Sequence, residues 1–190
     1  MIEEFDVPPA LGTVIETDRG SLPFALIHGE ALVAAAVWAL GEAGVTPVDF
    51  TVGWPALQES EEPFVLHDSL CPMTPAEFIA RCVVAAVERD AVVVGVRPVT
   101  DTVKTLEQGE DGVAVVGETV DRGDLLSVAS PIVLPAAVVE ALEELPTTDF
   151  AELAALLAGR FPVVTLEAPP SARRVGSVDD VRLLEALTRP

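Results

Sequence analysis

The chain has 190 residues, half of them hydrophobic, and a formal net charge of −20 at pH 7. This length and composition are enough to bury one core, so a single α/β domain is predicted over residues 1–190. The negative charge repels nucleic-acid phosphate and anionic lipid, which excludes both as partners over most of the surface. A phosphorylated ligand is possible only where some of the eleven basic side chains, ten arginines and Lys104, are gathered.

The N-terminal residues and the apolar runs favour a cytoplasmic protein. The longest apolar run, residues 31–40, is too short to cross a bilayer, and the N-terminus lacks the positive charges that open a signal peptide. Cys71 and Cys82 have the spacing of neither a zinc site nor a redox pair. We therefore expect no membrane contact and two reduced thiols.

Strand and helix patterns alternate along the chain. Strands are predicted over residues 11–15, 48–52, 64–66, 91–96, 127–133 and 161–166, and helices over residues 30–40, 75–89, 135–145, 149–160 and after Ser177. The stretch Thr74-Pro-Ala-Glu77 predicts a capping box that opens the second helix. That helix lies between two predicted strands, and such a β-α-β unit indicates a mainly parallel sheet.

A hairpin is predicted after the strand at 91–96. Residues 102–107 and 113–119 are two extended segments that flank Gln108-Gly-Glu-Asp-Gly112. We expect these segments to form an arm, about residues 102–122, that projects from the sheet.

Two loops at strand ends carry acidic groups. His67-Asp68 follows one buried strand, and Thr100-Asp101-Thr102 follows the strand at 91–96. Ligands of open parallel sheets bind outside the carboxyl ends of the strands, so both loops are candidate parts of a binding site. His67 itself is expected to be a structural hydrogen-bonding group, and Lys104 a solvated residue of the arm.

The motifs in and after these loops occur together, in order, in one known family. They are His67-Asp-Ser-Leu-Cys-Pro72, Pro98-Val-Thr-Asp-Thr-Val-Lys104 and Thr119-Val-Asp-Arg122, followed by Ala129-Ser-Pro131 and Arg174-Val-Gly-Ser-Val-Asp-Asp180. The chain resembles the 2-C-methyl-D-erythritol 4-phosphate cytidylyltransferases of isoprenoid precursor synthesis over roughly residues 64–187.

The resemblance implies a fold and a reaction. The fold is a Rossmann-like, three-layer α/β nucleotidyltransferase sheet, mostly parallel, with a protruding β-hairpin arm through which two subunits form a homodimer. In the reaction, Mg²⁺ and basic side chains hold CTP while the phosphate of a polyol phosphate attacks its α-phosphorus. Catalysis of this kind consists of positioning and charge neutralisation.

The resemblance also assigns residues. Asp68 matches the metal-binding aspartate of the family, and Arg174 replaces a catalytic lysine; both are candidate catalytic residues. The candidate groups that bind the acceptor are Asp101, Thr102, Arg122 and Ser130. Arginine and carboxylate suit a phosphate and a hard cation, respectively.

The nucleotide side departs from the family pattern. The family has a glycine-rich loop followed by Pro-Lys, whereas residues 12–24 here hold fewer glycines, the acids Glu16 and Asp18, and Phe24 in place of the lysine. Acidic groups repel a triphosphate, and a loop without glycines cannot bring its amides close to one. Cys71 also replaces the arginine of the His-Asp motif.

Three functions remain open from the sequence. The departures favour a degenerate family member that retains an acceptor-phosphate site and has weak or no CTP turnover. The alternatives are an active cytidylyltransferase with a rebuilt nucleotide pocket, and a non-catalytic regulator that forms a heterodimer with a full-length relative.

Overall fold

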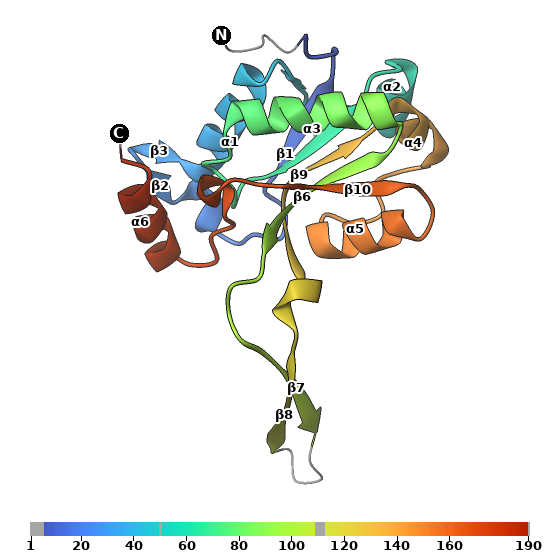
Figure 1. The fold of residues 1–190 in the computed structure, drawn as a ribbon. Helices are drawn as coiled ribbons and strands as arrows, with labels where there is room; N and C mark the ends of the chain where they lie inside the picture. The colour runs from blue at the N-terminus through green and yellow to red at the C-terminus, as the bar shows by residue number, and fades with distance from the viewer. Residues whose placement is uncertain (1–5, 50, 109–112, 190) are drawn as a thin grey trace.

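The computed structural model describes residues 6–49, 51–108 and 113–189. Its centre is a six-stranded sheet, and Figure 1 shows helices on both faces of it. The strands in spatial order are β10 (Val163–Glu167), β6 (Val92–Pro98), β9 (Leu126–Leu134), β5 (Phe64–Asp68), β1 (Leu11–Ile15) and β4 (Thr46–Pro47). β9 runs antiparallel to its neighbours β5 and β6, and the other pairs are parallel. The predicted fold class, a mostly parallel three-layer sheet, is confirmed.

Two apolar layers hold the helices on the sheet. α1 (Leu32–Glu42) and α3 (Ala76–Arg89) pack on one face, and α2 (Trp54–Glu59), α4 (Ala136–Ala141) and α5 (Phe150–Ala158) pack on the other. Alternate residues of each strand supply the two layers, as Val65 and Leu66 of β5 illustrate. The period of two that a buried strand requires therefore sets which side chains meet which helices.

A smaller cluster lies beside the main sheet. The short hairpin β2 (Leu26–Ile27) and β3 (Glu30–Ala31) turns through His28 and Gly29, both with positive φ. Positive φ at both central residues is the geometry of a tight two-residue hairpin turn. α6 (Val178–Leu187) packs on this hairpin through a buried cluster that includes Ile27 and Leu184.

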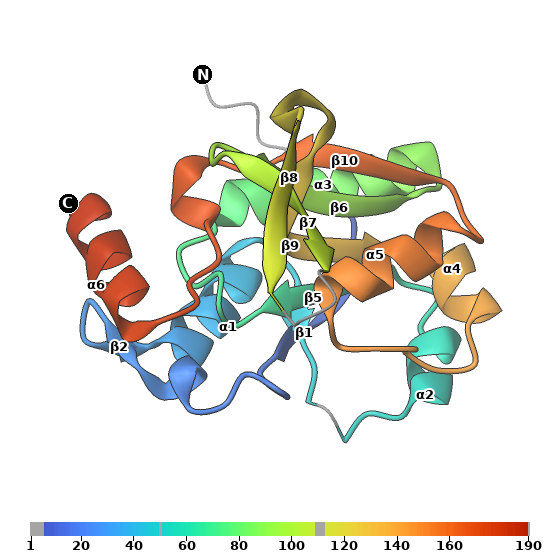
Figure 2. The same cartoon turned by 90° about the horizontal axis from the view of Figure 1, so that it is seen from below.

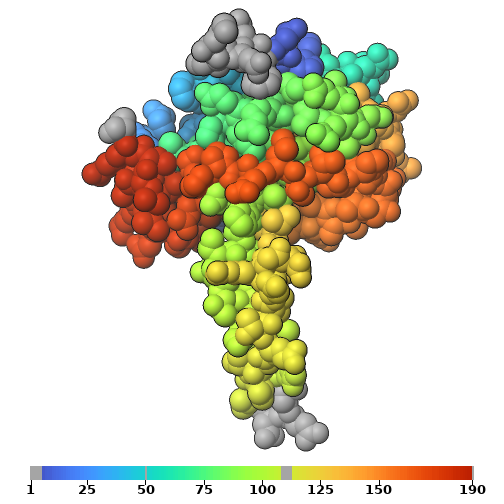
Figure 3. All heavy atoms as spheres, in the orientation of Figure 1, coloured from blue at the N-terminus to red at the C-terminus, as the bar shows by residue number. Residues whose placement is uncertain are grey.

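The two strands of the predicted arm are present, while residues 109–112 of its predicted turn lie outside the described residues. β7 (Val103–Gln108) and β8 (Ala114–Val120) pair antiparallel with each other and with no strand of the central sheet among the described residues. Figures 1 and 3 show the hairpin projecting well beyond the body. Figure 2 views the molecule along the arm, which leaves the body after β6 and returns through the 3-10 turn η2 (Arg122–Asp124) into β9.

Four local predictions are wrong, one of them the helix expected over residues 135–145, which ends at Ala141. The strand expected over residues 48–52 is replaced by β4 at Thr46–Pro47, because the Asp49 carboxylate accepts the Thr51 N–H at 2.8 Å and closes a turn. The helix expected from residue 30 begins at Leu32, because β3 uses the two preceding residues.

The fourth wrong prediction is the capping box. Thr74 donates its hydroxyl to the Cys71 carbonyl at 2.8 Å, and α3 begins after Pro75 with no side-chain cap. Asp149 and Ser177 cap α5 and α6, since each side chain accepts an N–H of the first turn of its helix.

Within the described residues, no helix is both long and apolar enough to span a lipid bilayer.

Candidate functional site

Asp68 is the last residue of β5 and lies at the carboxyl edge of the sheet. It pairs in register with Ile15, the last residue of β1, and is only 1% exposed. Its N–H donates to the Ser130 hydroxyl at 3.0 Å, and its Oδ1 accepts the Leu70 N–H at 3.0 Å. A buried carboxylate is costly unless it is paired, so its partners determine what this edge of the sheet can do.

Arg19 is the first partner of Asp68. It lies in the turn after β1, between Asp18 and Gly20, which both have φ near +60°. Its Nε donates to Asp68 Oδ1 at 3.1 Å, and one terminal nitrogen lies 3.4 Å from Oδ2. The same nitrogen donates to the Thr148 carbonyl at 2.8 Å, and the other to the Thr17 carbonyl at 3.0 Å. The Arg19 side chain is 6% exposed, so it is a fixed part of the fold.

Arg174 is the second partner and comes from the segment before α6. Its Nε donates to Asp68 Oδ2 at 3.0 Å, while 46% of its side chain remains exposed. The next residue, Val175, donates its N–H to the Leu70 carbonyl at 2.8 Å, which ties this segment to the turn after β5. Arg174 therefore presents part of its guanidinium to solvent from an anchored backbone.

The three charged groups leave a local positive excess. Two guanidinium groups surround one carboxylate, so the cluster formed by Arg19, Asp68 and Arg174 carries one net positive charge in a chain of net charge −20. An exposed guanidinium fork at such a place suits a phosphate or carboxylate. We call these three residues the arginine clamp.

The donor set of the arginine clamp does not fit a divalent cation. Mg²⁺ requires free oxygen ligands, and both Asp68 oxygens already accept nitrogen donors. No group of three or more His, Cys, Asp or Glu side chains in the described part of the chain is arranged to hold a metal ion. Asp68 as a metal ligand stays a prediction that this geometry does not favour.

His67 and Ser130 lie directly behind the arginine clamp. Both are fully buried, and His67 Nδ1 is hydrogen-bonded to the Ser130 hydroxyl. Burial lowers the pKa of His67 to about 4, against the opposing influence of the Asp68 charge. The backbone of Ser130 lies so close to Gly95 of β6 that a Cβ added to this glycine would be 2.7 Å from the Ser130 carbonyl oxygen. Within this chain, Ser130 thus positions the backbone of Asp68, and its predicted contact with an acceptor stays a prediction.

The remaining candidates lie at the base of the arm. Asp101, Thr102 and Arg122 are all exposed, and Arg122 donates to the Thr100 carbonyl at 2.6 Å. No hydrogen bond or ion pair joins them to the arginine clamp among the residues that the structure describes. Their roles in binding an acceptor also stay predictions. Lys104 is a residue of the arm, as expected, and donates to the Thr119 hydroxyl on the facing strand at 2.6 Å.

Sequence reasoning missed Arg19. Two features could have identified Arg19 as a site residue: its place in the loop after the first strand of a parallel sheet, and the scarcity of basic residues in the chain. Its partner Asp68 is 49 residues away, and no local pattern links the two.

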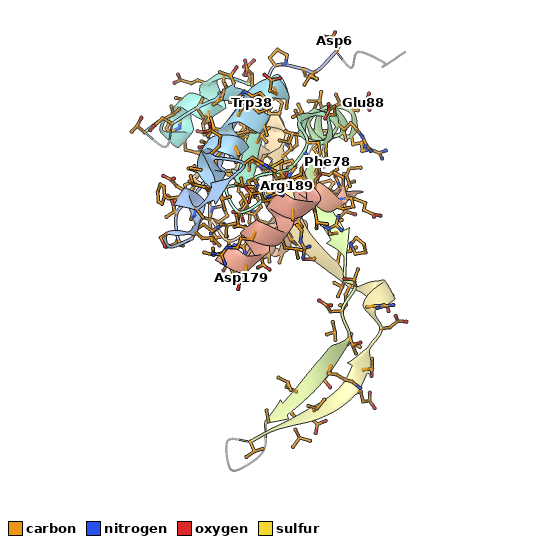
Figure 4. The ribbon with its side chains drawn as sticks, turned by 90° about the vertical axis from the view of Figure 1, so that its left-hand side faces the viewer. Asp6, Trp38, Phe78, Glu88, Asp179 and Arg189 are labelled. Carbon is orange, nitrogen blue, oxygen red and sulfur yellow. The ribbon has the colours of Figure 1, made fainter. Side chains whose placement is uncertain are left out.

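A mainly apolar hollow lies away from the arginine clamp. It has a volume of about 890 Å³ and lies between α1, the β2–β3 hairpin and the loop before α3, with Trp38 and Met73 among its mainly apolar lining. Figure 4 labels Trp38 on the body. No member of the arginine clamp lines this hollow, and its apolar surface is unsuited to a phosphate.

Comparisons with known proteins agree on one family. A family model described as 2-C-methyl-D-erythritol 4-phosphate cytidylyltransferase matches residues 42–187. Curated relatives with this name include one from Corynebacterium diphtheriae, 30% identical over 173 residues that make up 88% of this chain and 64% of the relative. Another, from Nocardia farcinica, is 34% identical over 126 residues, 65% of this chain and 52% of the relative. The chain thus spans less than two thirds of the length of these relatives.

Solved structures show a similar fold. The crystal structure of 2-C-methyl-D-erythritol 4-phosphate cytidylyltransferase from Thermus thermophilus is 22% identical, with a TM-score of 0.66 over 94% of this chain and 98% of that one. The structure of 4-diphosphocytidyl-2C-methyl-D-erythritol synthase from Anaerococcus prevotii is 15% identical, with a TM-score of 0.66 over 95% of this chain and 96% of that one. At these identities the likeness concerns the fold alone.

Proposed function

Since this chain belongs to the 2-C-methyl-D-erythritol 4-phosphate cytidylyltransferase family, we propose that it binds a polyol phosphate at the arginine clamp and turns over CTP weakly or not at all. The family consists of nucleotidyltransferases of the methylerythritol phosphate pathway. The proposal concerns which half of the family's two-substrate reaction this chain retains.

The observation that carries the proposal is the engagement of Asp68 by Arg19 and Arg174. The resemblance implies that the equivalent aspartate of the family binds the metal ion that accompanies CTP. Here the carboxylate has two guanidinium partners, one of them nearly buried. The charge that would hold the metal is therefore already neutralised, while one guanidinium stays exposed for an anion.

The loop after β1 supports the same conclusion for CTP. Glu16 and Asp18 are exposed in this loop, and Phe24, in the place of the family's lysine, is 62% exposed. Two carboxylates and an apolar ring give a triphosphate neither hydrogen-bond donors nor compensating charge. An incoming CTP would meet repulsion on the side of the sheet where the family binds it.

Calorimetric titration tests this division between the two substrates. We expect heat of binding with 2-C-methyl-D-erythritol 4-phosphate and none with CTP and Mg²⁺, because the anion donor is present and the nucleotide loop is acidic. The relative from Corynebacterium diphtheriae, titrated in parallel, is the positive control for CTP. Binding of CTP by this chain, followed by release of pyrophosphate, would instead establish the alternative of an active enzyme with a rebuilt pocket.

The arm supports a homodimer as the assembled form. Leu106 on β7 and Val116 on β8 are cross-strand partners, and they are 67% and 64% exposed; Val115 is 56% exposed. Figure 4 shows the hairpin standing apart from the body with its side chains directed outward. An isolated two-stranded hairpin is marginally stable, and burying these side chains against a second subunit would stabilise it.

Light scattering after gel filtration tests the dimer. We expect the mass of two chains for the unaltered protein and of one chain for Leu106→Asp, because a buried unpaired charge is strongly unfavourable. Val178→Asp on α6, where Val178 is 52% exposed, is the matched control and should leave the dimer intact. A monomer without any substitution would overturn the homodimer, and co-purification with a full-length relative would favour the heterodimer.

A further inference from the structure

All acceptor positions of the Asp68 carboxylate are in use. Oδ1 accepts from Arg19 Nε at 3.1 Å and from the Leu70 N–H at 3.0 Å. Oδ2 accepts from Arg174 Nε at 3.0 Å and from a terminal nitrogen of Arg19 at 3.4 Å. A carboxylate has about four lone-pair positions, so no oxygen position is left for a metal ion.

Arg19 cannot easily be displaced by a cation. Its side chain is 6% exposed, and its guanidinium also donates to the Thr17 and Thr148 carbonyls, which belong to two different loops. A divalent cation that took Asp68 would leave this guanidinium buried without a counter-charge, a strongly unfavourable state. Mg²⁺ would in addition have to give up bound water for a single carboxylate.

Arg174 differs from Arg19 in how many of its N–H donors are still available to a ligand. Only its Nε has a partner in the described part of the chain, and nearly half of its side chain is exposed. The hydrogen bond from Nε to Asp68 restricts the orientation of the guanidinium and leaves both terminal nitrogens available as donors. Two parallel N–H donors in that plane match the geometry of a phosphate group.

We propose that Arg19 replaces the divalent cation as the counter-charge of Asp68, and that Arg174, oriented by Asp68, binds the phosphate group of the ligand without a metal ion. The inference rests on the proposed function, since it describes how the retained acceptor site holds its phosphate. In it, Asp68 and Arg19 are positioning residues and Arg174 is the group that touches the ligand.

Binding in the presence and absence of metal tests the inference without any substitution. Calorimetric titration with 2-C-methyl-D-erythritol 4-phosphate is carried out once in EDTA and once in excess Mg²⁺, and inorganic phosphate is titrated as a second probe. We expect the same affinity for each probe in both buffers. Binding that appears only with Mg²⁺ would overturn the inference and leave the acceptor site of the proposed function standing. No binding of either probe in either buffer would overturn both.

A matched pair of variants tests the role of Arg174. Arg174→Gln is expected to weaken phosphate binding by about tenfold to a hundredfold, the range for losing charge-assisted hydrogen bonds. Arg182→Gln is the control, because Arg182 lies on α6 in an exposed ion pair with Asp179. This variant should bind phosphate as tightly as the unaltered protein does. Equal loss in both variants, or no loss in Arg174→Gln, would show that Arg174 is not the phosphate group's partner.

Manganese provides a readout that does not depend on the ligand. Paramagnetic Mn²⁺ titrated into the unaltered protein and into Asp68→Asn should give the same binding curve, because Asp68 offers no free oxygen. Loss of a Mn²⁺ site in Asp68→Asn would overturn the inference. Where Asp68→Asn fails to fold, the comparison of EDTA with Mg²⁺ still decides the question.

Discussion

Asp68→Asn is expected to lower the free energy of unfolding by about 3–5 kcal/mol, the range for breaking a buried ion pair by removing one partner. The substitution keeps the shape of the side chain and removes its charge. It leaves the Arg19 side chain, at 6% exposure, without a counter-charge, because its remaining acceptors are two loop carbonyls and the neutral amide oxygen of the new side chain. Urea unfolding of both proteins measures the difference.

The control for this variant is Asp179→Asn. Asp179 pairs with Arg182, and their side chains are 89% and 74% exposed, so its loss should cost no more than about 0.5 kcal/mol. Equal costs for Asp68→Asn and Asp179→Asn would contradict the view that the arginine clamp is a fixed part of the fold.

Double-mutant cycles can separate the two ion pairs of the arginine clamp. Arg174 is 46% exposed and can turn into solvent when Asp68 is altered, whereas Arg19 cannot. The coupling energy of Asp68 with Arg19 should therefore exceed that of Asp68 with Arg174. The reverse order would mean that Arg174, rather than Arg19, is the main stabilising partner.

His67 is expected to make the protein less stable as the pH falls from about 6.5 to about 4. Burial lowers the pKa of His67 in the folded chain from its ordinary value of 6.5 to about 4. Between these values the unfolded chain takes up a proton that the folded chain does not. Falling pH therefore stabilises the unfolded state relative to the folded state, and the free energy of unfolding decreases. The whole shift corresponds to roughly 3 kcal/mol, and above about pH 6.5 the effect is absent.

Comparison of variants isolates this histidine from the acidic residues that titrate in the same range. The chain has only two histidines, so His28→Gln is the matched control and should keep the pH dependence of the unaltered protein. His67→Gln should flatten it between about pH 6.5 and about pH 5, where carboxylates contribute little. NMR titration of the two imidazole rings gives a direct check. A His67 signal that titrates near its ordinary pKa would refute the expectation.

The sequence by itself determined the family and most of the elements. The motifs from His67 to Asp180 identified the family that the comparisons establish over residues 42–187. The buried strand β5, the helix α3 and the arm were predictable because their signals are local. Alternation, helical period and a glycine-rich turn act over a few residues, and neighbouring residues carry the whole signal.

Only the tertiary structure decided the direction of β9 and the partners of Asp68. β9 lies between β5 and β6 and runs against both, which nothing within its own residues specifies. Arg19 and Arg174 reach Asp68 across 49 and 106 residues, and the burial that makes these pairs strong exists only when the sheet has formed. The motif around Asp68 predicted this residue as part of a site. Its place at the centre of the arginine clamp depends on side chains that only the folded chain brings within hydrogen-bonding distance.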